Sequence, residues 1–137
     1  MESQVESTAR GVVESVSDRT LVLSIPGTNY RLHLEADAAG RDLTDLVGRR
    51  ITGRIEARAL RVHKARGGGR FIEPIDGHPR IVQGTVESID PAQRRVLVDV
   101  AVPMWVTLLD NQSPEQLAPG DLVNFYVKSG ATLTPSE

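Results

Sequence analysis

Short runs of alternating apolar and polar residues, separated by turn-forming residues, cover most of the chain. In the first half these runs are GVVESV at 11–16, TLVLSI at 20–25 and TNYRLHL at 28–34. Segments that alternate in this way, and that are rich in β-branched side chains, favour strands over helices. The pattern therefore predicts an all-β protein.

The second half repeats the same sequence of runs. GTVESI at 84–89 nearly copies the first hexamer at an offset of 73 residues, and RVLVDVAV at 95–102 and MWVTLL at 104–109 follow it. Gly48 and Gly120, each preceding a later apolar run, are 72 residues apart. Self-similarity at a fixed spacing is the signature of a repeated structural unit, so we expect two copies of one β-unit.

A short polar stretch with helical spacing interrupts each half, RDLTDLVG at 41–48 and SPEQLAPG at 113–120. Ser113 followed by Gln116 fits a capping box with Pro114 at the first helical position. Three strands, a short helix and two strands form the order of the OB-type barrel. We therefore predict two pseudo-repeated, five-stranded OB-like barrels, each with one short helix, at 1–64 and 81–137. A basic, glycine-rich hairpin at 65–80 would link them.

One change of register is expected inside the first unit. Apolar or small side chains fall on odd numbers from Ile51 to Ala57 but on even numbers at Leu60 and Val62. Because a slip of one residue exchanges the two faces of a strand, a bulge or bend is predicted near 58–60.

The composition is that of a globular protein, with 39% hydrophobic and 25% charged residues. The absence of cysteine excludes disulfides and cysteine-ligated metal sites. The most apolar run, 96–109, contains Asp99 and Pro103 and is too short to span a bilayer. The polar N-terminal stretch does not resemble a signal peptide. A cytoplasmic location is therefore expected.

Charge is distributed unevenly along the chain, whose net charge is −2. Residues 49–80 hold nine basic and three acidic groups, whereas residues 1–48 hold four and eight, and residues 81–137 hold three and seven. A basic centre can bind an anionic partner, or it can neutralise the two acidic flanks. The candidate anion- or nucleic-acid-binding residues are Arg54, Arg58, Arg61, Lys64, Arg66 and Arg70.

Two features bear on a nucleic-acid partner. Gly67, Gly68 and Gly69 could let a phosphate backbone approach closely, or could form a flexible hairpin tip; they lack the Lys-Ser/Thr of a P-loop. Aromatic side chains on which bases could stack are few. Phe125 shares the core-facing side of its run with Val123, whereas Tyr126 lies on the other side.

The second half resembles the molybdate-binding Mop/TOBE family of small OB-like modules over residues 80–134. The matching positions are Arg80, Gly84, Val86, Ser113, Leu117, Gly120, Asp121, Lys128 and Ser129, and Ile81 stands where the family usually has asparagine. The resemblance implies a stand-alone oxyanion carrier or sensor, with Arg80, Lys128 and Ser129 as the ligand-binding residues.

Catalytic signals are sparse. There is no Gly-x-Ser-x-Gly elbow, no cysteine nucleophile and no evident acid/base pair of carboxylates. His63 and His78 with Glu73 or Asp76 could form a two-histidine metal site, although such sites usually carry more ligands at regular spacing. We expect a non-catalytic binding module without a cofactor. Its partner would be anionic (a nucleic acid or a small oxyanion), another protein, or a second copy of the chain.

Overall fold

A computed structural model describes residues 7–36, 42–109 and 112–136, and they form an all-β structure, as predicted. Strands of four residues or more carry most of the structure, and two- or three-residue strands lie between them. The strands are β1 (Ala9–Ser17), β2 (Thr20–Ser24), β3 (Arg31–Ala36), β4 (Arg50–Ala59), β5 (His63–Lys64), β6 (Phe71–Glu73), β7 (Asp76–Gly77), β8 (Ile81–Asp90), β9 (Arg95–Asp99), β10 (Pro103–Leu108), β11 (Leu122–Tyr126) and β12 (Thr132–Pro135).

Five strands close into a barrel. β1 pairs with β2, β2 with β3, β3 with β12, β12 with β4, and β4 returns to β1. Only the pairing of β3 with β12 is parallel. Closure matters for so small a sheet because it leaves no long unpaired edge.

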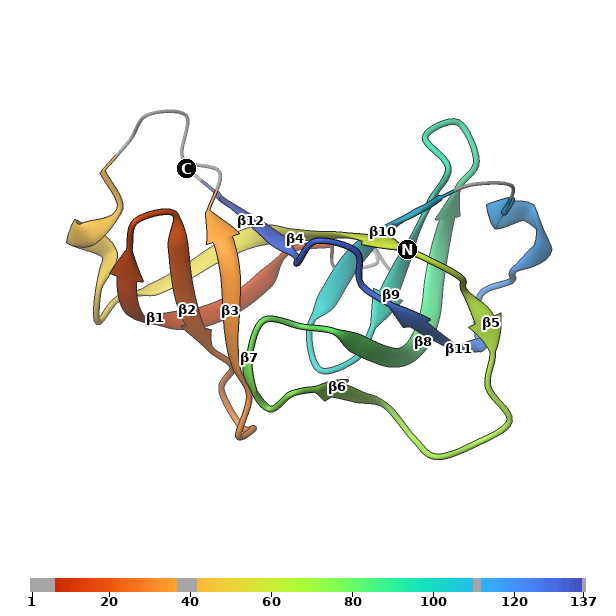
Figure 1. The fold of residues 1–137 in the computed structure, drawn as a ribbon, viewed down its shortest axis with the longest axis horizontal. Coiled ribbons are helices and arrows are strands. Elements are labelled where there is room, and N and C mark those ends of the chain that lie inside the picture. The colour runs from red at the N-terminus through yellow and green to blue at the C-terminus, as the bar shows by residue number, and fades with distance from the viewer. Residues whose placement is uncertain (1–6, 37–41, 110–111, 137) are drawn as a thin grey trace, which may run out of the picture.

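A second group of strands lies beside the barrel (Figure 1). β8, β9 and β10 follow one another as antiparallel neighbours, and β11 pairs with the other edge of β8. β10 also pairs in parallel with the last residues of β4, from Glu56 to Ala59. An isolated bridge between Ala59 and Val127 joins β4 to the chain just after β11.

Strand pairing connects the two predicted units. β12 lies within 81–137 but completes the barrel of β1–β4, while the end of β4 lies within 1–64 but pairs with β10. β4 is therefore shared by both groups of strands, and Figure 1 shows it running from one to the other. Buried side chains of the two groups form one continuous cluster, which includes Leu21, Ile55, Met104 and Phe125.

Several local details recur in the two groups. A register shift interrupts β1 between Val13 and Ser15, and another interrupts β8 between Val86 and Ser88. The amide of Val13 donates to Arg49 O at 3.0 Å, and the amide of Val86 donates to Asp121 O at 2.8 Å. The carbonyls of the same two valines accept from Gly48 and Gly120, at 2.7 and 2.8 Å.

Three-residue 3-10 turns, Thr44–Leu46 and Pro114–Gln116, stand where the short helices are expected. Ser113 accepts a hydrogen bond from the amide of Glu115 and Pro114 follows it, so this turn begins where the sequence predicts. Asp42 precedes the other turn. Its pKa is lowered because its carboxylate accepts hydrogen bonds from the amide and the hydroxyl of Thr44, at 3.0 and 2.8 Å. No helix in the described part of the chain has the length and apolar character of a membrane span.

The predicted bend follows β4, but the predicted inward position of Leu60 is wrong. Its buried residues are odd-numbered up to Ala59, whereas Leu60 is exposed and Val62 is buried. The chain leaves the strand at this point, and Leu60 N donates to Tyr126 O at 3.0 Å.

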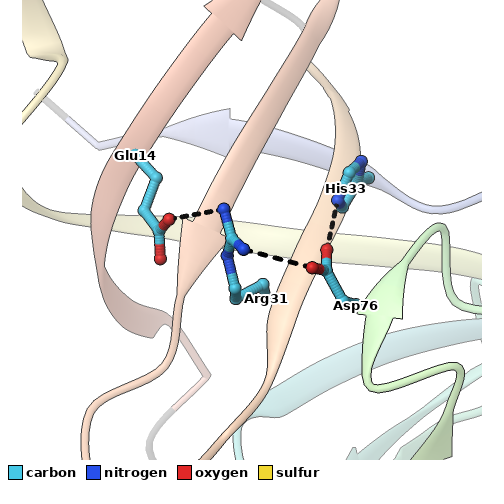
Figure 2. A network of polar contacts seen from close by, with 4 residues as sticks. All are labelled: Glu14, Arg31, His33 and Asp76. Atoms are coloured by element: carbon cyan, nitrogen blue, oxygen red, sulfur yellow. Dashed lines mark hydrogen bonds and ion pairs between the residues drawn. The ribbon is translucent and has the colours of Figure 1, made fainter.

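Residues 61–80 lie across both groups of strands. β5 pairs with β11 and β6 with β8, while β7 pairs in parallel with β3 of the barrel. Figure 2 shows how β7 is held there: Arg31 of β3 lies between Glu14 of β1, at 2.7 Å, and Asp76 of β7, at 3.1 Å. His33 Nε2 lies 2.7 Å from the other oxygen of Asp76. The ring centroids of His78 and His33 are 5.7 Å apart.

Gly11 and Gly84 allow their strands to lie close to a neighbouring strand. A Cβ at Gly11 would lie 2.6 Å from Leu23 Cγ and 2.8 Å from Ser24 O, and one at Gly84 would lie 2.5 Å from Val98 Cγ1 and 2.7 Å from Asp99 O.

Gly11→Ala and Gly84→Ala should each lower the free energy of unfolding by about 1–3 kcal/mol in urea titrations, through overpacking. Gly67→Ala, where a Cβ has no atom within 4 Å, is the matched control. Equal stability of all three variants would contradict this packing.

The ion pairs of Asp76 are exposed, so they should hold β7 locally without contributing much to global stability. Asp76→Asn should change the free energy of unfolding by less than about 1 kcal/mol. It should nevertheless speed hydrogen exchange of the Arg31 amide, which donates to Ile75 O at 2.9 Å. Asp18→Asn, at an exposed turn of the same barrel, is the control and should leave that amide unchanged. Unaltered exchange in Asp76→Asn would show that the pairs do not hold the segment.

Candidate anion-binding surface

Three arginines, Arg50, Arg54 and Arg58, project from the outer face of β4. They alternate with Gly53, Ile55, Ala57 and Ala59, whose side chains or Cα atoms face the buried side. All three arginines are exposed. We call them the arginine row. Because β4 extends through both groups of strands, the row runs along the surface that the two groups share.

Hydroxyl and ammonium groups border the arginine row. Thr134 of β12 lies opposite Arg54, and Thr107 of β10 lies opposite Arg58. Lys128, which is exposed, donates its amide to Arg58 O at 2.8 Å, so the two residues are neighbours across adjacent chain segments. Within the described residues, no carboxylate lies within 4 Å of the charged groups of the row or of Lys128. Their charges are therefore available to a ligand.

One carboxylate interrupts this surface. Glu56 lies between Arg54 and Arg58 on the same strand, opposite Thr132 on one side and Trp105 on the other. It is partly buried. Its negative charge reduces the local positive potential, so its position matters for the strength of anion binding.

The structure divides the basic strip expected from the sequence. Arg54 and Arg58 belong to the arginine row, and the exposed Arg61 follows the end of β4. Lys64 lies 3.5 Å from Asp121, and Arg70 pairs with Asp99, so an acidic side chain offsets each of these charges. Arg66 is exposed on the loop between β5 and β6.

The glycine-rich loop is anchored by a buried side chain. Gln83 of β8 is 5% exposed, and its amide nitrogen donates to Gly67 O at 3.0 Å and to Gly69 O at 2.7 Å. Its oxygen accepts from Asn124 at 3.0 Å. These bonds hold the carbonyl groups of Gly67 and Gly69, and with them the backbone of the loop, against β8 and β11.

The two aromatic residues nearest the arginine row differ in accessibility. The guanidinium of Arg95 lies 4.2 Å above the ring of Trp105 and also bonds to Asp90, so it covers that ring. Tyr126 is 54% exposed, whereas its neighbour Phe125 is fully buried, as the sequence predicts. An exposed aromatic ring therefore lies beside Lys128, two residues away on the same side of the chain.

Two of the oxyanion candidates, Arg80 and Lys128, lie in one region, and the third, Ser129, lines a hollow. Arg80 O accepts from the amide of Val127 at 2.8 Å, which brings Arg80 and Lys128 into the same region. Ser129 lines a hollow of about 370 Å3, but Arg80 and Lys128 are not among the residues that line it. The lining includes Arg19 and His78 and also the carboxylates of Asp18 and Glu35.

The metal interpretation gains no support from the described residues. None of their histidine, aspartate and glutamate side chains form a group of three that could hold a metal ion. His63 lies on β5, opposite Asn124, whereas His78 lies next to His33 of the barrel.

Sequence reasoning missed part of the surface. Arg50 is absent from the predicted strip although it belongs to the row, and the threonines of β10 and β12 were not candidates at all. The spacing of Arg50, Arg54 and Arg58 at even positions of one strand would have identified the row. The threonines come from strands distant in sequence, so no local signal could have found them.

No protein-family model, curated protein or solved structure matches this chain.

Gln83 provides a test of the anchored loop. Gln83→Ala removes three hydrogen bonds and should lower the free energy of unfolding by about 1–3 kcal/mol. It should also speed tryptic cleavage after Arg66 and Arg70, which flank the glycines. Gln93→Ala, at an exposed turn, should change neither property. Unchanged cleavage of the Gln83 variant would mean that this side chain does not restrain the loop.

Proposed function

We propose that this chain is a non-catalytic binding module that holds an extended anionic polymer along the arginine row. The observation that carries the proposal is the exposure of Arg50, Arg54 and Arg58 on one face of one strand, without a carboxylate partner among the described residues. Arginine is suited to this task because its planar guanidinium donates two parallel hydrogen bonds to an oxyanion.

The spacing of the row favours a polymer over a small anion. At about 3.3 Å per residue, Arg50 and Arg54 are separated by about 13 Å along β4, and Arg50 and Arg58 by about 26 Å. A single small oxyanion needs donors that converge within hydrogen-bond distance. A linear polyanion can instead contact the three guanidinium groups in turn, with the threonine hydroxyls as additional donors.

A small oxyanion is a second candidate ligand, and it would bind in the hollow lined by Ser129, Arg19 and His78. These residues supply a hydroxyl, a guanidinium and an imidazole. Asp18 and Glu35 line the same hollow, and their charges repel an anion. A partner that adds a strand has little support, because the strands left unpaired along one whole edge in the described structure, β5, β6 and β7, have only two or three residues.

We further infer that the two groups of strands are copies of one five-stranded, OB-like unit whose last strands are exchanged. Support comes from the matching register shifts at 13–15 and 86–88 and from the matching bonds made by Val13 and Val86. On this interpretation the arginine row lies on the strand that both copies use. A polymer bound there would contact both units at once.

Binding of inorganic polyphosphate tests the proposed function. It should bind the protein with an affinity that falls as salt rises, with a slope of about −2 in log K against log salt for three contacts, by the single-strand value. The variant Arg50→Gln, Arg54→Gln, Arg58→Gln should lose most of this binding. Three single Arg→Gln variants should each make the slope shallower by about 0.7.

Two controls separate the arginine row from net charge. Arg19→Gln removes one positive charge from an exposed turn away from β4 and should keep the affinity and the slope of the parent. Glu56→Gln should strengthen binding, because it removes the carboxylate between Arg54 and Arg58. Equal losses in Arg19→Gln and in the single variants of the row would overturn the proposed site.

A further inference from the structure

The surface beside the arginine row carries an exposed ring. Tyr126 is 54% exposed and Leu60 is 40% exposed, and the two are adjacent because Leu60 N donates to Tyr126 O at 3.0 Å. Ile81 lies opposite Tyr126 across β8 and β11. The ring, which is more than half exposed, thus stands at the edge of a small apolar platform.

Positive groups lie on one side of this platform. Tyr126 and Lys128 are two residues apart on one chain segment, and Leu60 and Arg58 are two residues apart on the other. The bridge between Ala59 and Val127 holds the two segments side by side. The apolar platform is therefore bordered by two cations, Lys128 and Arg58, and Arg58 is the last member of the arginine row.

A carboxylate and a guanidinium lie on another side of the platform. Glu73 of β6 is exposed and lies opposite Ile81 on the edge of β8 away from β11. The exposed Arg80, whose amide donates to Glu73 O at 2.8 Å, lies next to it, so this side carries both signs of charge, whereas the side along β4 carries Arg58 and Lys128.

We infer that the extended polymer is a single-stranded nucleic acid, with one base stacked on Tyr126 while its phosphates contact Lys128 and the arginine row. This inference rests on the proposed function, since it names the class of polymer held at the same surface. A stacking ring beside a track of cations is the common arrangement of sequence-tolerant single-strand binding. A polyanion without bases would gain nothing from an exposed aromatic ring, and a duplex keeps its bases stacked on one another.

The alternative aromatic residues do not fit this role. Arg95 covers the ring of Trp105, and Phe125 is fully buried. The ring of Tyr30 is not open for stacking either, because it packs against the core and its hydroxyl accepts a hydrogen bond from the amide of Ile72. Phe71 of β6 is partly buried, so Tyr126 is the one aromatic side chain (Phe, Tyr or Trp) among the described residues that is largely exposed, and the inference makes it decisive.

The test uses the full chain and a labelled single-stranded oligonucleotide of about a dozen nucleotides, with a probe of the same length and charge that lacks bases. Titrations followed by fluorescence anisotropy give the affinity for each. The parent should bind the oligonucleotide more tightly than the abasic strand. Tyr126→Leu should weaken oligonucleotide binding roughly 5- to 150-fold and leave abasic-strand and polyphosphate binding unchanged. Tyr126→Phe should retain the affinity of the parent.

The outcomes distinguish this inference from the proposed function. Equal affinity for the oligonucleotide and the abasic strand, or a Tyr126→Leu variant that binds both as the parent does, would overturn stacking while polyphosphate binding by the row stands. Tighter binding of a duplex than of the single strand would also overturn it. If the parent protein does not bind polyphosphate, the proposed function itself is overturned. Far-ultraviolet circular dichroism and thermal unfolding would establish that the exposed Tyr126 variants are folded.

Discussion

The pairing of β4 with strands from both ends of the chain is the constraint on which the structure depends. Backbone amides and carbonyls that are removed from water must find partners, and β4 finds them in β1 and β12 along its first part and in β10 and Val127 along its last. Neither half of the chain satisfies its own strands. The side chains that this pairing buries form one cluster, so the two groups of strands share a core as well as a strand.

The same constraint creates the surface proposed to bind a polyanion. A strand that serves two groups has one face buried in both and the other face exposed along its whole length. Arg50, Arg54 and Arg58 occupy that exposed face, while Gly53, Ile55 and Ala57 occupy the buried one. Alternation of inward and outward side chains normally separates core from solvent within one small sheet. Here it places the charges in a row that is longer than the strand of one small barrel.

Alternation predicted the strands well, because burial on one face leaves a period of two in the sequence. The opposite orientations of Phe125 and Tyr126 could be read in this way, as could the bend after Ala59, although Leu60 is exposed where the alternation places it inside. The pairing partners of these strands could not be predicted from alternation. Two similar halves carry the same local pattern whichever half supplies the closing strand, so nothing at 132–135 identified β3 and β4 as its neighbours. The anchoring of Gly67 and Gly69 was invisible for a related reason, since Gln83 is distant in sequence and carries no motif.

The position of β12 has a consequence for synthesis on the ribosome. β1, β2, β3 and β4 are complete once residue 59 has been made, yet their barrel stays open until residues 132–135 emerge, because β12 lies between β3 and β4. At translation rates of about 5–20 residues per second, the nascent chain exposes unpaired edges of β3 and β4 for several seconds. During that interval these two edges are open to pairing with another chain.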